Sequence, residues 1–345
     1  MATHGDVVGV GNIYRRFNDP DLYPAGRKVG SRFLNLVTTT HAGGISLVKW
    51  GLTRRPGSWE QFIDAPYGPP PPPVVDGQRL RVTHVNHATW LLQGNGLNIL
   101  TDPIWSVRCS PFASVGPKRH RPPGIRFNDL PKIDGILLSH NHYDHLDLPT
   151  LRKLSKRFQP WVATGLGNGP IVKSAGVSRV VELDWWQSIQ VQEGVEVTAV
   201  PVQHFSGRGL WDRDQTLWVG FVLSLPQSVT FFAGDTGFGP HFKQIATGFP
   251  EIDISLLPIG AFRPEWFMSR VHMSPEEAIQ AHAVLGSKTS VGIHYGTFRL
   301  ADDGQTEGPD RIRAALAVHP DPKPRFWIME FGEGREVPLE FTKSI

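Results

Sequence analysis

The chain has 345 residues, of which 40% are hydrophobic, so it can bury the core of one large domain or two modest ones, and global disorder is excluded. Charged residues make up 19%, and a net charge of +3 lacks the basic field of a nucleic-acid binder, so we expect no nucleic acid as a partner. The single cysteine, Cys109, excludes an intrachain disulfide and a cysteine-rich zinc module, whereas 14 histidines are available as metal ligands.

The N-terminal region has neither the pattern of a secretory signal nor an apolar run long enough to span a membrane, which predicts a cytoplasmic protein. Residues 33–50 end in apolar side chains beside Lys49 and Trp50, a combination that either packs on the domain surface or lies peripherally on the inner membrane face. Five consecutive prolines at 69–73 predict a stiff spacer. We therefore divide the chain into an N-terminal appendage, 1–75, for membrane or dimer contact, and a globular domain, 76–345.

From residue 80 onward, short apolar runs end in turn residues, which is the pattern of β-strands. The runs predict strands at 80–85, 89–92, 97–100, 136–138, 195–202, 218–225, 229–233, 254–258 and 291–293. One helix is expected from Pro149 to Phe158, and a second after Ser274, whose cap pattern includes Glu277, ending at Gly286. Strands outnumber helices, which predicts a mixed α/β body with much antiparallel pairing.

The strongest chemical signal is the stretch His140-Asn141-His142-Tyr143-Asp144-His145, which directly follows an apolar run. Imidazoles and a carboxylate suit zinc or a similar divalent ion, and so many of them in one loop can serve two adjacent metals. Three further candidates, His204, Asp235 and His294, also follow apolar strands. Each alone would more often be structural, but strand ends converge on one face in α/β scaffolds, and together the residues complete a set of seven ligands.

These residues resemble the metallo-β-lactamase fold superfamily, which carries a His-x-His-x-Asp-His string followed by later His, Asp and His ligands. Longer stretches resemble the N-acylphosphatidylethanolamine-hydrolysing phospholipase D family within that superfamily. The matching stretches are 101–104, 116–119, 139–147, 182–186, 232–237, 258–261 and 294–298. The resemblance implies an α/β fold of the four-layer αββα metallo-β-lactamase sandwich type, with 76–345 as its catalytic domain.

The resemblance implies two Zn²⁺ ions per chain and a hydroxide between them as the nucleophile. The implied ligands are His140, His142 and His204 for one zinc and Asp144, His145 and His294 for the other, with Asp235 bridging both. The two carboxylates, Asp144 and Asp235, are thereby assigned catalytic roles.

Further residues are expected around this centre. His272 matches a histidine near the metals and Arg208 an arginine, so the resemblance implies that both bind a substrate phosphate and that His272 is also catalytic, protonating a leaving alkoxide. Asp147 is expected either to orient a ligand imidazole or to cap the helix that follows. His84 and His87 straddle a strand end, and we expect structural or supporting roles for both.

Three departures from the family pattern, Asn86, Val271 and Tyr295, bear on the substrate more than on metal binding. The favoured function is a zinc-dependent phosphodiesterase of the phospholipase D type, converting N-acylphosphatidylethanolamine to N-acylethanolamine and phosphatidic acid. The alternative is a zinc-dependent lactonase or β-lactamase-like acyl hydrolase, because the same nucleophile attacks a carbonyl. A nuclease is disfavoured by the modest net charge, and a non-catalytic protein by the complete ligand set. The expected partners are a phospholipid or another phosphodiester, a membrane surface, and a second copy in a homodimer.

Overall fold

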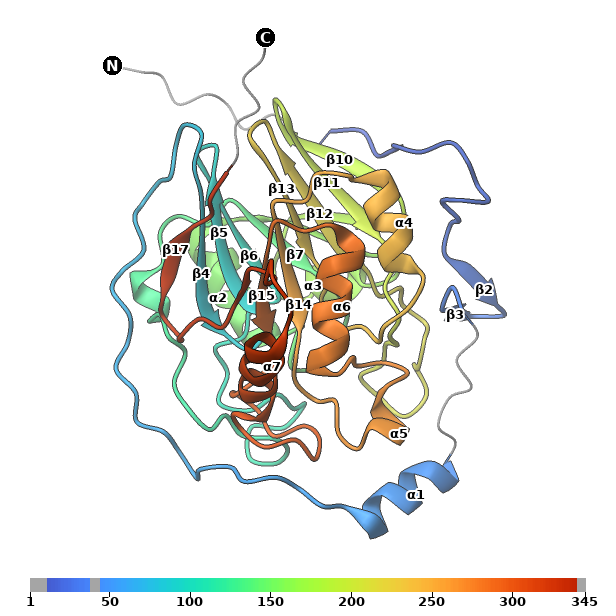
Figure 1. Cartoon of the computed structure of the whole chain (residues 1–345). Helices are drawn as coiled ribbons and strands as arrows, with labels where there is room; N and C mark the ends of the chain where they lie inside the picture. Colours follow the sequence, from blue (N-terminus) through green and yellow to red (C-terminus); the bar gives the residue numbers. More distant parts are fainter. Residues whose placement is uncertain (1–10, 38–43, 340–345) are drawn as a thin grey trace.

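Two β-sheets packed face to face form the centre of the molecule, with helices on both outer sides (Figure 1). The computed structural model describes residues 11–37 and 44–339. One sheet has seven strands in the order β17-β4-β5-β6-β7-β8-β9. Its strands are β4 (Leu80–Asn86), β5 (Thr89–Gly94), β6 (Leu97–Thr101), β7 (Gly135–Leu138), β8 (Trp161–Gly165), β9 (Arg179–Leu183) and β17 (Gly334–Glu336).

The direction of these strands decides which of their ends meet. β4 and β5 are antiparallel, as are β5 and β6, whereas β6, β7, β8 and β9 run parallel. The turn from β5 to β6 uses Asn95 and Gly96 at φ of 51° and 77°, the left-handed conformation that a tight hairpin favours. As a result, β4, β6 and β7 all end at the same edge of the sandwich.

The other sheet has eight strands in the order β1-β10-β11-β12-β13-β14-β15-β16. They are β1 (Tyr14–Arg15), β10 (Gln187–Gln192), β11 (Val195–Val200), β12 (Gly220–Leu225), β13 (Ser228–Phe232), β14 (Ile254–Pro258), β15 (Thr289–Ile293) and β16 (Phe326–Trp327). β12 is antiparallel to both β11 and β13, and β13 to β16 are parallel. The ends of β11, β13 and β15 therefore also share one edge. β2 (Arg27–Val29) and β3 (Arg32–Leu34) form a separate hairpin.

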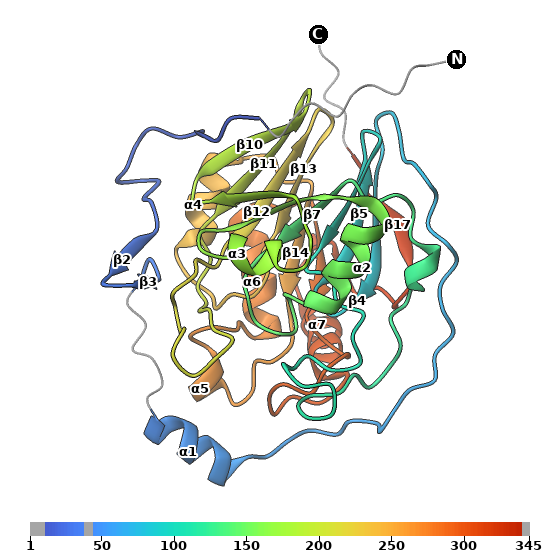
Figure 2. The ribbon, with the colours of Figure 1, turned by 180° about the vertical axis from the view of Figure 1, so that it is seen from behind.

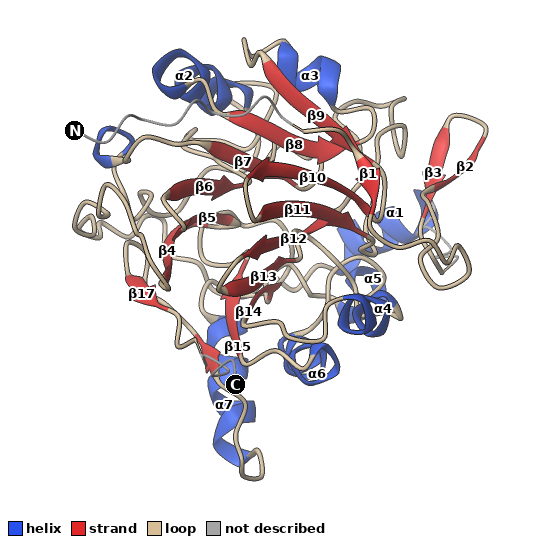
Figure 3. Cartoon of the chain, turned by 90° about the horizontal axis from the view of Figure 1, so that it is seen from above, coloured by secondary structure: helices blue, strands red, loops and turns tan. Residues whose placement is uncertain are grey.

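The helices complete the layers. They are α1 (Gly44–Thr53), α2 (Leu148–Phe158), α3 (Gly169–Lys173), α4 (His241–Gly248), α5 (Glu265–Met268), α6 (Pro275–Leu285) and α7 (Glu307–Val318), with a 3-10 turn at Phe127–Asp129. Seen from above, α2 and α3 cover the seven-stranded sheet, and α4, α6 and α7 cover the eight-stranded one (Figure 3). The view from behind shows α2 and α3 on the near side, and α1 and α5 at one end of the sandwich (Figure 2). This four-layer αββα arrangement confirms the predicted fold class.

The predicted strands and both predicted helices are present, with small differences at their ends. The strand expected over 195–202 ends at Val200, because Pro201 has no amide for the ladder. β8, β9 and β10 were not predicted, since Thr164, Glu182 and Gln190 interrupt their apolar runs. These strands are stabilised by pairing with neighbouring strands rather than by a strong apolar pattern in their own sequence.

The segment before the proline run lies against the domain at several points. β1 extends the eight-stranded sheet by pairing with β10, and Phe33 is buried in the main core. Pro72 and Pro73 accept hydrogen bonds from Gln93 and Asn98. The division of the chain at residue 75 stays a prediction, and positions 1–10, 38–43 and 340–345 lie outside the described residues. Within the described part of the chain, every helix is too short or too polar to cross a bilayer.

The start of α6 yields a stability prediction. The Glu277 amide donates to Ser274 Oγ at 3.2 Å, and the Ser274 amide donates to Glu277 Oε2 at 2.8 Å, which is a complete capping box. We expect Ser274→Ala to lower the free energy of unfolding by about 1 kcal/mol, and Ser274→Gly by only a few tenths. Urea denaturation of both variants measures the difference. Equal losses would contradict a capping role.

Candidate metal centre

The predicted ligands meet at the shared edge of the two sheets. The loop after β7 carries the ligands at 140–145, and His204, Asp235 and His294 follow β11, β13 and β15. Because the ends of these strands lie at one edge, ligands up to 150 positions apart in the sequence come into contact, as Asp144 and His294 do. All seven predicted ligands are buried or half-buried there.

Three imidazoles form the first group. His142 Nδ1 lies 2.8 Å from His140 Nε2 and 3.2 Å from His204 Nε2, so three ring nitrogens converge on one point. Asp235 Oδ2 lies 3.9 Å from His140 Nε2 and 3.7 Å from His204 Nε2. The carboxylate of Asp235 therefore faces this group from one side.

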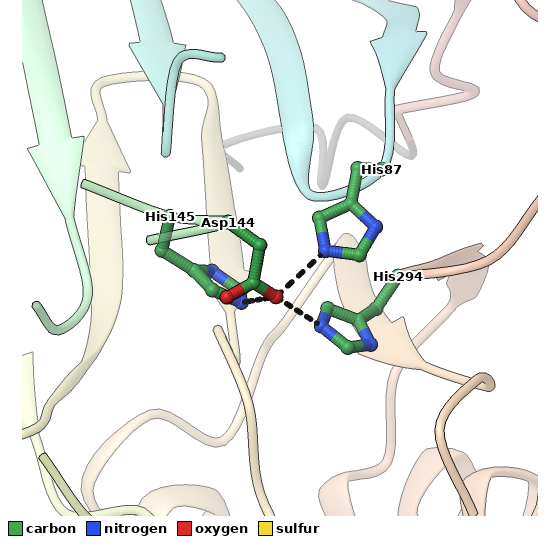
Figure 4. A group of neighbouring side chains, drawn as sticks. All are labelled: His87, Asp144, His145 and His294. Atoms are coloured by element: carbon green, nitrogen blue, oxygen red, sulfur yellow. Dashed lines mark hydrogen bonds and ion pairs between the residues drawn. The ribbon is translucent and has the colours of Figure 1, made fainter. Parts of the chain in front are cut away.

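The second group contains a carboxylate and two imidazoles. Asp144 Oδ2 is 3.2 Å from both His145 Nε2 and His294 Nε2 (Figure 4). Asp235 Oδ2 is 3.1 Å from His145 Nε2 and 3.2 Å from His294 Nε2. One oxygen of Asp235 thus lies between the two groups, where a shared ligand would have to be.

In His145 and His204, the ring nitrogen that faces away from the site is bonded to a partner that fixes the orientation of the ring. His145 Nδ1 is 2.6 Å from Asp102 Oδ2, and His204 Nδ1 donates to the carbonyl of Val271 at 2.9 Å. These bonds leave each Nε2 lone pair directed into the site, as a metal ligand requires. Val271 acts through its backbone, so its departure from the family pattern leaves this contact intact.

Asp102 is a site residue that sequence reasoning missed. It follows β6, is fully buried, and also accepts from the amide and hydroxyl of Ser139 at 2.7 and 2.6 Å. Its position at a strand end, inside a stretch that resembles the family, was the available signal. The role that we considered for Asp147, orienting a ligand ring, belongs to Asp102. Asp147 occupies the N-cap position of α2, but its side chain makes no capping hydrogen bond to the helix and instead accepts hydrogen bonds from Ser106.

The electrostatics of the site favour lone-pair donors in the first group. Burial and neighbouring rings lower the pKa of His140 and His204 well below the ordinary value, and burial lowers the pKa of His142 to about 4. These imidazoles are therefore neutral at neutral pH. Neutral imidazole is the form that binds a metal.

The second group balances negative charge with protons. Burial raises the pKa of Asp144 and Asp235, but the imidazoles of His145 and His294 together outweigh it, so the pKa of both carboxyl groups lies well below its usual value. Burial lowers the pKa of His145 and His294, yet the surrounding carboxylates raise it overall, to about 9 for His294. In the protein without metal, protons on these two rings neutralise the carboxylates.

The donor set fits two divalent cations. Asp235 Oδ1 is buried without a hydrogen-bond partner among residues 11–37 and 44–339, and His145 Nε2 lies between the carboxylates of Asp144 and Asp235, as expected of a site that holds a cation. Nitrogen and carboxylate donors in groups of three, with a shared carboxylate, are a set that zinc accepts. One cation would be held by His140, His142 and His204, the other by Asp144, His145 and His294, with Asp235 between them.

A cavity of about 300 Å³ opens onto the site. Apart from metal-site residues, its lining includes Cys109, Tyr143, Phe205, Gly207, Ala261, Met268 and Leu300. His272 also lines it, with its ring centre 5.1 Å from that of His204 and 5.4 Å from that of His294. Within the described residues its Nδ1 is buried without a hydrogen-bond partner.

Arg208 lies beside the ligand loop. Its Nη1 donates to the carbonyls of Asn141 at 2.7 Å and Leu146 at 2.9 Å, and its guanidinium stacks 3.9 Å from the centre of the Tyr143 ring. These contacts hold the loop that carries the ligands. Binding of a substrate phosphate by Arg208 stays a prediction.

The two histidines near the end of β4 lie in different surroundings. His84 is buried against Trp90, and its Nδ1 lies 3.0 Å from the carbonyl of Met329, away from the ligands. His87 instead points into the second group, where its Nε2 lies 3.0 Å from Asp144 Oδ2 (Figure 4).

Comparison with known proteins agrees with this geometry. The family model described as "Beta-lactamase superfamily domain" matches residues 97–295. An uncharacterized protein of Mycobacterium tuberculosis is 41% identical over 276 residues, which cover 79% of this chain and 73% of that protein. N-acyl-phosphatidylethanolamine-hydrolyzing phospholipase D 1 of Caenorhabditis elegans is 34% identical over 266 residues, covering 74% and 75%.

A solved structure extends the comparison to the fold. The isothiocyanate hydrolase from Delia radicum gut bacteria superposes with a TM-score of 0.60 at 19% identity, covering 74% of this chain and 98% of that one. Its similarity bears on the fold alone. The extent of the family match and the cluster of histidines and aspartates at the strand ends show that the chain belongs to the metallo-β-lactamase superfamily of metal-dependent hydrolases.

Proposed function

We propose that this protein is a dinuclear zinc phosphodiesterase that hydrolyses N-acylphosphatidylethanolamine to N-acylethanolamine and phosphatidic acid. The observation that carries the proposal is the 34% identity to the Caenorhabditis elegans phospholipase over 74% of this chain. The shared position of Asp235 between two donor groups supports it, because phosphoryl transfer benefits from two adjacent cations.

The chemistry divides between the cations and the chain. Two bound zinc ions would lower the pKa of a water molecule and offset negative charge on the phosphoryl oxygens. The chain holds the donors in place: Asp102 orients His145, and Arg208 secures the ligand loop. Burial lowers the pKa of His272 to about 4, so its neutral ring offers one N–H to a phosphoryl oxygen or to the leaving oxygen.

The size and surroundings of the cavity agree with a lipid headgroup. A volume of about 300 Å³ holds a phosphodiester but not the three acyl chains of this substrate, which must lie outside. The segments that flank the cavity present large apolar side chains to solvent: Leu210 and Trp211 are 90% and 84% exposed beside Gly207, and Phe112 is 65% exposed near Cys109. A membrane surface would cover such groups.

The helix α1 adds to the same rim. Its Leu52 is 83% exposed, and its Trp50 stacks on Phe267 of α5, next to the cavity residue Met268. Lys49 lies 4.7 Å from the centre of the exposed Trp266 ring, a pairing of cationic and aromatic groups that suits an anionic lipid interface. We propose that this rim is the peripheral membrane contact.

The reaction is tested by mass spectrometry of products from N-acylphosphatidylethanolamine micelles incubated with zinc-loaded protein. We expect the wild type to form phosphatidic acid. Asp235→Asn should lower the activity by more than the roughly 100-fold that is typical when a hydrogen-bond partner of a metal ligand is lost, because it removes the charged carboxylate shared by both metals. Asp253→Asn, which alters a buried aspartate before β14 at the other edge, is the control and should stay active. An untouched substrate with two zinc ions bound would refute the phospholipid assignment and favour a lactone.

Metal binding should release protons. His145 and His294 carry protons at pH 7.5 in the metal-free protein, since their pKa values are raised, to about 9 for His294. We expect about two protons to leave these rings as zinc binds, in addition to any from a water molecule that the zinc ions ionise, and fewer well above pH 9, where His294 is largely neutral beforehand. Calorimetric titration of chelator-treated protein in buffers of different ionisation enthalpy measures this number. Zinc uptake without proton release would contradict the assigned second group.

The rim is tested with vesicles of phosphatidylcholine and phosphatidylglycerol. Burial of an apolar side chain contributes on the order of 1 kcal/mol, so Leu210→Ser combined with Trp211→Ser should weaken vesicle binding about tenfold or more. Val318→Ser, at the distal end of α7 and 85% exposed, is the matched control. Unchanged binding would assign these residues to another surface, such as the predicted homodimer, which analytical ultracentrifugation without vesicles detects.

A further inference from the structure

We infer that His87 is a positioning residue of the second metal group, and that it acts by donating a hydrogen bond from Nε2 to the carboxylate of Asp144. This inference rests on the metal centre of the proposed function and not on its substrate. His87 lies in the turn between β4 and β5, on the opposite side of Asp144 from His145 (Figure 4). The superfamily's set of seven ligands does not include it.

The geometry identifies a hydrogen bond. His87 Nε2 lies 3.0 Å from Asp144 Oδ2, the same oxygen that faces His145 and His294 at 3.2 Å. His87 is 1% exposed, and its Nδ1 has no hydrogen-bond partner in the described residues. A buried N–H without an acceptor is more costly than a buried lone pair, so the proton belongs on Nε2, where Asp144 accepts it.

The backbone around His87 is built to hold the ring in this place. Its amide donates to Thr297 Oγ1 at 3.0 Å, and its carbonyl accepts from the amide of His294 at 3.0 Å. Both His87 and His294 adopt positive φ, at 47° and 64°, a conformation that residues with side chains rarely take. Strained residues of this kind gather at functional sites because the surrounding structure must hold them there.

The second group needs this support more than the first. Asp144 has a flexible carboxylate that can rotate away from the metal, and one of its oxygens has to remain directed at the point between His145 and His294. A donor fixed by the backbone of the turn prevents that rotation. Asp144, His145, His294 and Asp235 already supply four donors, the usual number for zinc, so His87 is not required as a ligand.

The test measures binding of Zn²⁺ alone to chelator-treated protein by isothermal titration calorimetry, with no phospholipid present. His87→Phe keeps the ring volume and removes the donor, and we expect the affinity for one zinc equivalent to fall about 10- to 100-fold while the other is kept. His87→Gln, whose amide reaches Asp144, should restore most of that affinity, whereas His87→Asn is too short and should not. The pair of amide variants keeps the test decisive if the Phe variant folds poorly.

The control is His84→Phe, which alters a buried histidine of β4, three residues before His87, without contacting a ligand. It should keep both zinc affinities, whatever it costs in thermal stability. Unchanged affinities in His87→Phe and His87→Asn, or equal loss at both equivalents, would overturn the inference. Equal loss in His87→Gln and His87→Asn would also overturn it, because a donor would then not suffice. Failure to cleave phospholipid would refute the proposed substrate and leave these binding results intact.

Discussion

Two carboxylates buried among imidazoles require positive charge beside them, and the organisation of this site follows from that requirement. Asp144 and Asp235 lie out of bulk water, where an unpaired carboxylate would be very unfavourable. In the metal-free protein the protons on His145 and His294 supply the compensating charge. Divalent cations supply it more strongly. The same groups therefore stabilise the metal-free protein and would exchange their protons for metal.

The fold satisfies this requirement by bringing strand ends together. Strands β7, β11, β13 and β15 belong to two sheets, and the chain directions of both sheets bring the ends of these strands to one edge. The residues before each ligand are apolar and are buried in strands. The loops that follow these strands are not constrained by the hydrogen bonds of the sheets. The sheets thus form a rigid scaffold, and the loops attached to it form the site. This arrangement holds the donor atoms close together without strain in the strands.

Around the donors, a second layer of hydrogen bonds determines which atom of each ring faces the metal. Asp102, Ser139 and the carbonyl of Val271 occupy the outer nitrogens, and His87 acts on a carboxylate in the same manner. Arg208 secures the loop itself through backbone carbonyls. This layer draws on residues from both sheets and from the loop before α6, so the integrity of the centre depends on the packing of the whole sandwich.

The sequence by itself determined the elements with strong local signals. The apolar runs of β4 to β7 and β11 to β15, the capping box at Ser274 and the helix end at Gly286 could all be read locally, because each depends on side chains a few residues apart. The dense ligand motif at 140–145 pointed to a metal, and the residues at three later strand ends completed a ligand set. Strands such as β8 and β9 could not be read, since their stability comes from neighbours distant in the chain.

Only the tertiary structure decided how the residues around the metal divide their roles. Asp102 rather than Asp147 orients His145, and His84 and His87, three positions apart, separate into a packing residue and a site residue. Sequence spacing cannot distinguish such pairs, because the difference lies in which way each side chain points from a turn and in what the opposite sheet presents to it. Those orientations are decided by the packing of the two sheets, which no local pattern contains.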